Sequence, residues 1–359
     1  MTAELSGVHD ELRAVARDLL GEADPGREVA WKRIAESGWT GLEVPEALNG
    51  ADATFAEVAI VLEEMGRAAA CTPYLGAVVL GVGALALLEP GPGRDALLRD
   101  TASGAAVPAV ALPGDTGAAC AEPSFRLEQS PQGLLLHGSA AFVPDAVGAD
   151  RLLLPALAPG GTFVLVDAGP DAAGLSAAGQ PLLDATRHFG HVTADGVPVE
   201  EDSVRRFAGD PEAALRRLAD RAAVALACDS LGLSEAMLDA TVAYAGVREQ
   251  FGRPIGSFQA VKHACADMLV QITVARRLVE AAAGALSCGD PESGVSASMA
   301  KSYACGVAVD VTGKAMQLHG GMGYTWESGI HVYLKRAALN RSLFGSPSSH
   351  RRRIAARYK

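Results

Sequence analysis

Apolar residues recur every three or four positions in the first part of the chain. The spacing is clear in residues 8–20, 31–37 and 55–66, and the third run closes on Gly66, a residue type common where helices end. Residues 1–20 read as an acidic amphipathic helix without the basic start and long apolar run of a signal peptide. We therefore predict a helical N-terminal domain over residues 1–105 and a cytoplasmic location.

The pattern changes near Ala106. Short runs rich in Val, Leu and Phe now alternate with clusters of Gly, Pro and Asp, which is typical of antiparallel strands joined by tight turns. These features predict a middle β-domain over residues 106–208. Its expected strands cover residues 107–112, 134–137, 151–154, 162–166 and 191–199.

Helical spacing returns in the last part of the chain, where one helix is expected to begin near Pro211 and another to cover residues 329–343. Ala, Leu and Val lie on more than one face of these helices, as in helices buried on two sides. The pattern predicts a C-terminal helical bundle over residues 209–359 that pairs with its neighbours as a tetramer, a dimer of dimers. An Ala-rich composition by itself is the alternative explanation.

Composition and charge narrow the classes of function. The 359 residues are 49% hydrophobic and 20% charged, which is typical of a globular chain. A net charge of −11 argues against nucleic acid and anionic membrane as partners. The six cysteines show no Cys-x-x-Cys spacing and no nearby histidine pair, so we expect neither a metal site nor a disulfide framework.

A link of unusual composition, residues 248–259, separates two long helical patterns. Gly252, Pro254 and Gly256 suit a tight connection between antiparallel helices. Arg248 opens the link, and its planar guanidinium, which has several donors, is suited to a phosphate or pyrophosphate. An arginine that only complements the dipole at a helix C-terminus is the alternative.

A glycine-rich segment, residues 317–327, follows a later helical run. Its glycines would let a ligand approach the backbone closely, and a simple helix stop is the alternative. Together the two segments show Arg before Gln-Phe-Gly-Arg-Pro-Ile, then Phe-Gln, and later Gln-x-x-Gly-Gly-x-Gly-Tyr. In these motifs the chain resembles the C-terminal domain of the flavin-dependent acyl-CoA dehydrogenase family over residues 220–350, and only diffusely before them.

The resemblance implies a mainly α fold with a middle β-domain: an N-terminal helical domain, a β-barrel or sandwich, and a C-terminal four-helix bundle. It implies FAD as the cofactor, α,β-desaturation of an acyl thioester of CoA or a carrier protein, and an electron acceptor such as an electron-transfer flavoprotein. In the family, a subunit holds the pyrophosphate and adenosine end of its neighbour's FAD. The matching positions here are Arg248, Gln250, Phe251, Gln259, Gln317, Gly320 and Gly321.

The flavin-ring side departs from the family pattern. Residues 121–124 read Ala-Glu-Pro-Ser without the Gly-Ser-Asp that usually follows, and Phe142 stands in the stretch where a tryptophan is usual. The two positions at which family members place the catalytic glutamate are Phe344 and Ala222 here. Neither side chain can accept a proton, so the chain lacks the base that removes the α-proton.

Asp220 is the remaining candidate for a base. It lies two residues before Ala222, and a two-residue shift turns a side chain by about 200° around a helix, so Asp220 is expected to face away from the site. A solvated carboxylate is the simpler interpretation. His319 and His350 are isolated in the sequence and are expected to be structural or exposed.

Loss of both glutamate positions with retention of the adenosine-side residues resembles the smaller, partner-dependent subunits of heterotetrameric acyl-CoA dehydrogenases. That group acts on bulky CoA thioesters such as those of steroid side chains. We therefore interpret the chain as a dehydrogenase subunit whose catalytic glutamate comes from a second subunit. The alternatives are a homo-oligomeric flavoprotein with an unorthodox base or another reaction, and a non-redox scaffold of the same fold.

Overall fold

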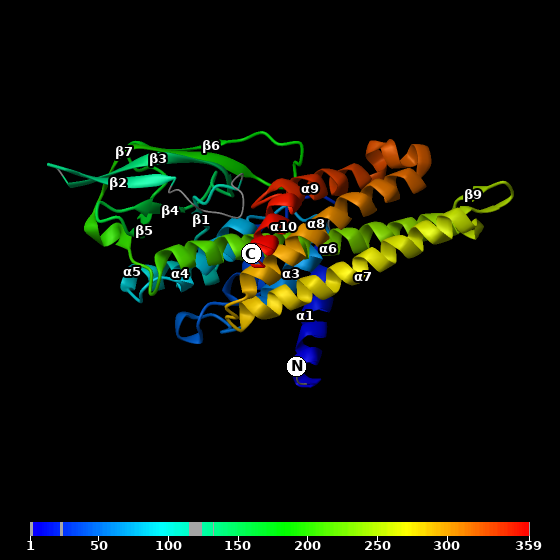
Figure 1. The fold of residues 1–359 in the computed structure, drawn as a ribbon, viewed down its shortest axis with the longest axis horizontal. Coiled ribbons are helices and arrows are strands. Elements are labelled where there is room, and N and C mark those ends of the chain that lie inside the picture. The colour runs from blue at the N-terminus through cyan, green and yellow to red at the C-terminus, as the bar shows by residue number, and fades with distance from the viewer. Residues whose placement is uncertain (1–2, 22–23, 115–123, 132, 359) are drawn as a thin grey trace.

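The computed structural model describes residues 3–21, 24–114, 124–131 and 133–358. Helices dominate, and one connected β-sheet lies to one side of them (Figure 1). Along the chain the order is helices, then strands, then helices again. The predicted fold class, a mainly α protein with a middle β-domain, is thereby confirmed.

The first apolar runs form the predicted helices α1 (Ala3–Gly21), α2 (Trp31–Glu36) and α3 (Phe55–Arg67). Thr54 and Glu57 form a capping box at the start of α3. The apolar segment after α3 is buried all round, so it shows no amphipathic period from which its type could be predicted. The further elements of this part are η1 (Trp39–Gly41), η2 (Glu46–Leu48), the π-helix η3 (Leu75–Val82), α4 (Gly83–Ala86) and α5 (Pro92–Ala102).

The sheet connects eight strands in the order β6-β7-β3-β2-β4-β5-β8, with β1 beside β4. The predicted antiparallel pairing holds for most neighbouring strands, but β1 and β2 both run parallel to β4. Alternation along a strand specifies which face is buried but not the direction of its neighbour. The strands are β1 (Pro108–Val110), β2 (Phe125–Ser130), β3 (Gly133–Pro144), β4 (Arg151–Leu157), β5 (Phe163–Ala168), β6 (Leu175–Gly179), β7 (Phe189–Val199) and β8 (Val204–Arg205).

Five helices form the last part of the chain. Asp210 caps the first of them and Pro211 occupies its first turn, where a missing N–H costs nothing. None of the helices in the described ranges is long and apolar enough to cross a membrane. The helices are α6 (Pro211–Val247), α7 (Gln259–Ser287), α8 (Ser293–Leu318), α9 (Ile330–Ser342) and α10 (Pro347–Ala356).

Helices from the two ends of the chain share one hydrophobic core. The approach of α3 to α6 requires two glycines, because a Cβ on Gly232 would lie 1.8 Å from the carbonyl oxygen of Glu63, and one on Gly66 would lie 2.0 Å from that of Asp229. The sheet has a second core of its own, which includes Phe125, Leu136 and Val192. The N-terminal and C-terminal helices are therefore one packing unit.

A buried charge hub ties the sheet to the helices. Asp229 on α6 accepts hydrogen bonds from Arg336 Nε (3.0 Å) and Asn340 Nδ2 (2.6 Å) on α9. Arg187, in the connection from β6 to β7, lies 3.0 Å from the same carboxylate. Burial disfavours ionisation of Asp229, but the two arginines outweigh it and hold the pKa of this carboxyl well below its usual range.

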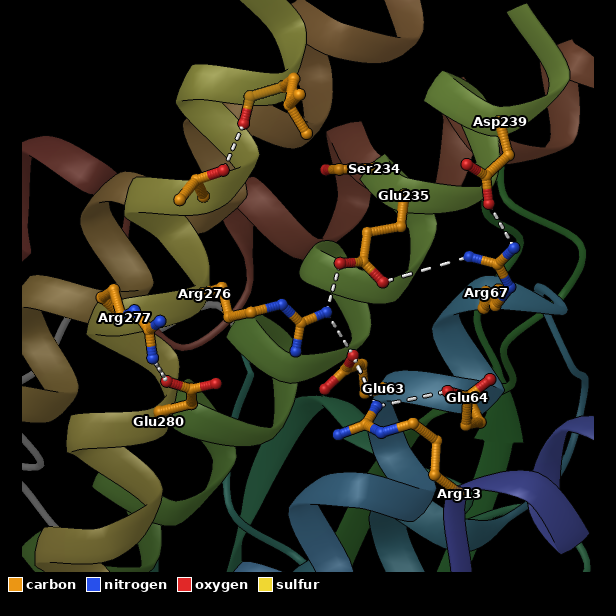
Figure 2. Close-up of polar contacts among 12 residues, drawn as sticks. Arg13, Glu63, Glu64, Arg67, Ser234, Glu235, Asp239, Arg276, Arg277 and Glu280 are labelled. Carbon is orange, nitrogen blue, oxygen red and sulfur yellow. Dashed lines mark hydrogen bonds and ion pairs between the residues drawn. The ribbon is translucent and has the colours of Figure 1, made fainter. Parts of the chain in front are cut away.

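A second charge network joins α1, α3, α6 and α7 (Figure 2). Glu63 Oε1 on α3 accepts a hydrogen bond from Arg13 of α1 and another from Arg276 of α7, each at 2.7 Å. Arg276 also pairs with Glu235 of α6. The network therefore bridges helices from both ends of the chain.

Candidate functional site

The link between α6 and α7 is a connector between antiparallel helices, as the sequence predicts, and it is built as a short hairpin. Strand β9 (Glu249–Gln250) pairs with β10 (Arg253–Pro254), and η5 (Ile255–Ser257) leads into α7. The two turn residues, Phe251 and Gly252, have φ values of 57° and 75°, which suit a two-residue hairpin turn. The hairpin projects from the end of the helix pair that lies away from the sheet (Figure 1).

Side chains on this hairpin face solvent. Phe251 is 90% exposed and makes only an edge-on ring contact with Phe258, at 6.1 Å between centroids. Arg253 lies over the Phe258 ring at 4.2 Å. Arg248 at the end of α6 is exposed and has no carboxylate partner among the residues that the structure describes. An unpaired guanidinium beside an exposed phenylalanine is suited to an anionic ligand with a flat group.

The glycine-rich segment forms a tight turn, η6 (Gly320–Tyr324), directly after α8. Gly320 has a φ of 59°, and there is open space where side chains of Gly320 and Gly321 would stand. Gly323 has a different role, because a Cβ there would lie 2.3 Å from the carbonyl oxygen of Met316. A ligand can therefore approach the backbone at the first two glycines, while the third allows the turn to close.

A ring contact brings the two segments together. Tyr244, one turn before Arg248, stacks on His319 at the end of α8, with ring centroids 4.4 Å apart and planes 23° apart. His319 Nδ1 lies 2.8 Å from the carbonyl oxygen of Ala315, which fixes the ring within α8. All seven positions predicted to hold the pyrophosphate and adenosine end of FAD are exposed: Arg248, Gln250, Phe251, Gln259, Gln317, Gly320 and Gly321.

Phe344, at the usual glutamate position, is buried in a loop held from three sides. Its φ is 48°, in the left-handed region that a phenylalanine rarely adopts. Its N–H donates to the carbonyl oxygen of Gly114 at 2.7 Å, and its own carbonyl oxygen lies 2.9 Å from His350 Nε2. Lys301 is buried, and its Nζ donates to the carbonyl oxygen of Gly345 at 3.1 Å. Burial lowers the pKa of His350 to about 4, so its ring is neutral in this loop at neutral pH.

The second glutamate position and the candidate base both lie inside the protein. Ala222 is fully buried in α6. Asp220 is 6% exposed and carries a two-point ion pair with Arg353 of α10, in which Arg353 Nη2 lies 2.9 Å from Oδ2. The interpretation of Asp220 as a solvated carboxylate is therefore wrong, because a residue far along the chain covers and neutralises it.

Gly114 bridges two of the departures from the family pattern. It donates its N–H to the carbonyl oxygen of Phe142 (3.1 Å) in β3 and accepts from Phe344. A Cβ at Gly114 would lie 2.7 Å from that Phe142 oxygen, so the bridge needs glycine. Gln180 Oε1 accepts the Phe142 N–H at 2.5 Å. Positions 121–123, where the Glu-Pro motif stands, lie outside the described residues.

Sequence reasoning missed a pocket at the start of α10. Ser346 caps this helix, and its Oγ accepts the N–H of Ser349 at 3.3 Å. Arg341 and Arg351 are exposed there and pair with no carboxylate in the described part of the chain. The Ser-Pro-Ser-Ser run before three arginines was the available signal. The pocket measures about 420 Å³ and is lined by Val309, Ala338, Arg341, Ser342, Ser346, Pro347, Ser348 and Arg351.

These features fit one part of a flavin dinucleotide better than another. The unpaired Arg248 and the open backbone at Gly320 and Gly321 suit phosphates and a nucleoside. At the ring side, the described residues place no carboxylate at either glutamate position, Phe344 or Ala222. The exposed, open elements are thus those predicted for the adenosine side, whereas in the described part of the chain neither predicted glutamate position carries a proton-accepting side chain.

Comparison with known proteins gives the class. Residues 212–359 match the family described as acyl-CoA dehydrogenase, C-terminal domain, and residues 7–103 match acyl-CoA dehydrogenase, N-terminal domain. The chain belongs to the acyl-CoA dehydrogenase family, whose cofactor is FAD. Among individual relatives, acyl-CoA dehydrogenase IpdE2 of Mycolicibacterium smegmatis is 32% identical over 349 residues, covering 97% of this chain and 92% of the relative.

Solved structures agree with this assignment. The Tcur3481-Tcur3483 steroid ACAD G363A variant has a TM-score of 0.85 at 30% identity, covering 98% of each chain. The ChsE4-ChsE5 complex from Mycobacterium tuberculosis shares the fold, with a TM-score of 0.86 at 23% identity over 100% of this chain and 98% of that chain.

Proposed function

We propose that this chain is the glutamate-lacking subunit of a hetero-oligomeric, FAD-dependent acyl-CoA dehydrogenase. The assembled enzyme desaturates the α,β bond of a bulky acyl thioester, of the kind derived from steroid side chains. A second acyl-CoA dehydrogenase subunit supplies the catalytic glutamate, and an electron acceptor such as an electron-transfer flavoprotein reoxidises the flavin.

One observation carries this proposal. All seven adenosine-side positions are exposed on two projecting segments, whereas the two glutamate positions are the buried side chains Phe344 and Ala222. A chain that kept only its own active site would have no use for an exposed, unpaired Arg248 at the tip of α6. A chain that completes its neighbour's cofactor site needs that arrangement.

The chemistry divides between the two subunits. When bound, FAD would supply the hydride acceptor for the β-carbon of the thioester, and a carboxylate of the partner would take the α-proton. In this chain Arg248 would neutralise pyrophosphate charge, and the open backbone at Gly320 and Gly321 would lie against the nucleoside. Tyr244 and His319 keep these two segments in a fixed relation.

Similarity to the Tcur3481-Tcur3483 steroid ACAD supports both the partner and the substrate class, since the name of that protein joins two gene products and includes the word steroid. Exposed apolar residues on the long helices support an assembly as a tetramer. They include Val242 and Val247 on α6 and Leu269, Val270 and Val274 on α7. Burying such a stripe against another subunit is the usual reason for its presence. We place the complex in the cytoplasm.

Co-expression with a glutamate-bearing relative tests the proposal. The complex should be yellow and the chain alone colourless, with flavin measured per protein after denaturation. Arg248→Ala should lower the flavin content of the complex and leave its assembly intact, whereas the matched exposed variant Arg126→Ala on β2 should change neither. Full flavin content in the Arg248→Ala complex would exclude the proposed role. A yellow chain without a partner would instead favour the homo-oligomeric alternative.

A further inference from the structure

Two large aromatic side chains stand almost free on the turns that follow α8. Tyr324 is 74% exposed and Trp326, in the short turn η7 (Trp326–Ser328), is 77% exposed. Met322 beside them is half exposed. We call these three residues the aromatic ledge. It directly follows the open backbone of Gly320 and Gly321.

The ledge is rigid. Gly323 lets the turn pack directly on the backbone of Met316, because a Cβ there would lie 2.3 Å from the Met316 carbonyl oxygen. Thr325 donates both its N–H (3.0 Å) and its hydroxyl (2.9 Å) to the carbonyl oxygen of Met322. The Trp326 ring is braced by His331 of α9, edge to face, with centroids 4.4 Å apart and planes 76° apart. The Trp326 side chain is therefore exposed and also held in a fixed position.

A cation lies over one face of the indole ring. Lys335 Nζ lies 5.0 Å from the Trp326 ring centroid, in cation–π geometry. Burial and Lys335 lower the pKa of His331, so the brace is a neutral ring at neutral pH. A flat aromatic surface with an ammonium beside it and open glycine backbone before it offers stacking, charge and close backbone approach together.

We infer that Trp326 is a stacking site for a purine base. The inference rests on the proposed function, because the purine would be the adenine of the flavin dinucleotide whose phosphates meet Arg248. Stacking needs a π-face and no hydrogen-bond pattern, and it is most effective on a large, fixed ring. The ledge meets both conditions, and Lys335 adds attraction for the neighbouring phosphates.

A nucleotide suits the surface better than an apolar protein segment does. The ledge does not form a continuous apolar patch. Glu327 and Lys335 flank it, and the glycines before it carry no side chains. Burying it under a protein would leave these charges to be desolvated. A nucleotide instead uses the ring, the cation and the open backbone at once.

The chain alone allows a direct test, with ADP as the probe. Among the three tryptophans, Trp39 is buried and Trp31 is half-buried, so Trp326 is the accessible fluorophore. ADP should quench tryptophan fluorescence saturably, and a Trp31→Phe protein should keep this response. In equilibrium dialysis, Trp326→Leu should weaken ADP binding about tenfold or more, the range expected for losing one base stack.

Inorganic pyrophosphate separates the base from the phosphates. Trp326→Leu should leave pyrophosphate binding unchanged, while Arg248→Ala should weaken both pyrophosphate and ADP. Unchanged ADP binding in Trp326→Leu overturns the inference. So does a Trp326→Leu chain that binds ADP normally but no longer assembles with its partner, because the ledge would then be a protein contact.

The outcomes also separate this inference from the proposed function. A flavin-containing complex that depends on Arg248 but is indifferent to Trp326→Leu would retain the proposed function and reject the stacking site. The chain could also bind ADP in a way that depends on Trp326 and yet never yield a flavin-containing complex. That result would retain the stacking site and reject the proposed function. Circular dichroism of the Trp326→Leu chain checks that this variant folds.

Discussion

The carboxylate of Asp220 illustrates how one ion pair decides a residue's role. Arg353 binds both of its oxygens, so its charge is already paired inside the protein. We predict that Asp220→Asn leaves turnover of the assembled enzyme within about twofold of the parent. It should lower the free energy of unfolding by about 1–2 kcal/mol, because hydrogen bonds to a charged group are lost from a partly buried site. Steady-state kinetics and urea unfolding measure these two effects, and loss of turnover with a normal fold would restore Asp220 as a base.

Asp145 gives a pH prediction at the same scale. Its carboxylate is buried and accepts a hydrogen bond from the N–H of Gly76 at 2.8 Å. Burial raises its pKa from 3.8 to about 6, outweighing that hydrogen bond and the positive charges of Arg187 and Arg336. Because the folded value is the higher one, the folded protein binds more protons between these pH values. The contribution of Asp145 to stability is therefore fully present below about pH 4 and falls by about 3 kcal/mol as pH rises through 6.

Removing that titration should stabilise the protein above about pH 4, and by more as the pH rises. We predict that Asp145→Asn is more stable than the parent at pH 7.5, and that this gain exceeds the gain at pH 5 by about 1 kcal/mol. Urea unfolding at the two pH values measures the difference, with Asp171→Asn as an exposed control. Equal effects at both pH values would show that Asp145 does not titrate in this range.

At the scale of elements, Arg276 links three helices. It donates to Glu63 of α3 at 2.7 Å and pairs with Glu235 of α6, with 26% of its side chain exposed (Figure 2). Arg276→Met leaves both carboxylates without this partner, and we expect a loss of about 1–3 kcal/mol in the free energy of unfolding. Partial exposure places the loss toward the lower end of that range.

The neighbouring arginine is a matched control. Arg277 pairs only with Glu280 of its own helix among the described residues, at 2.9 Å, and its side chain is 77% exposed. Arg277→Met should cost less than about 0.5 kcal/mol, as is usual for an exposed pair within one helix. Similar losses for the two variants in urea unfolding would mean that bridging helices adds nothing to the network.

The whole molecule is organised by its cores. Leu62 and Met65 of α3 share one core with Leu226 and Leu231 of α6, although the sequence predicts separate domains over residues 1–105 and 209–359. Residues 209–359 produced alone should therefore lack fixed tertiary packing, because the buried face of α6 would lose its cover. Near-ultraviolet circular dichroism should show little signal for this fragment, and addition of residues 1–105 should restore it. Cooperative unfolding of the fragment alone would contradict this.

The sequence by itself determined the features that local chemistry encodes. Periodic apolar runs predicted α1, α2 and α3, and Gly252 and Pro254 marked the link that became a hairpin. The motifs around Arg248 and Gly320 indicated the family, and counting along them located Phe344 and Ala222. Such inferences succeed because a turn, a helix face or a short motif depends on residues close together in the chain.

Only the tertiary structure decided which distant residues meet. It covered Asp220 with Arg353, stacked Tyr244 on His319, joined Phe142 to Phe344 through Gly114, and set β1 and β2 parallel to β4. It also left Trp326 exposed on a rigid turn. An apolar period states which side of an element is buried, but neither the partner nor its direction. Those follow from packing the whole chain, where burial and charge pairing are satisfied together.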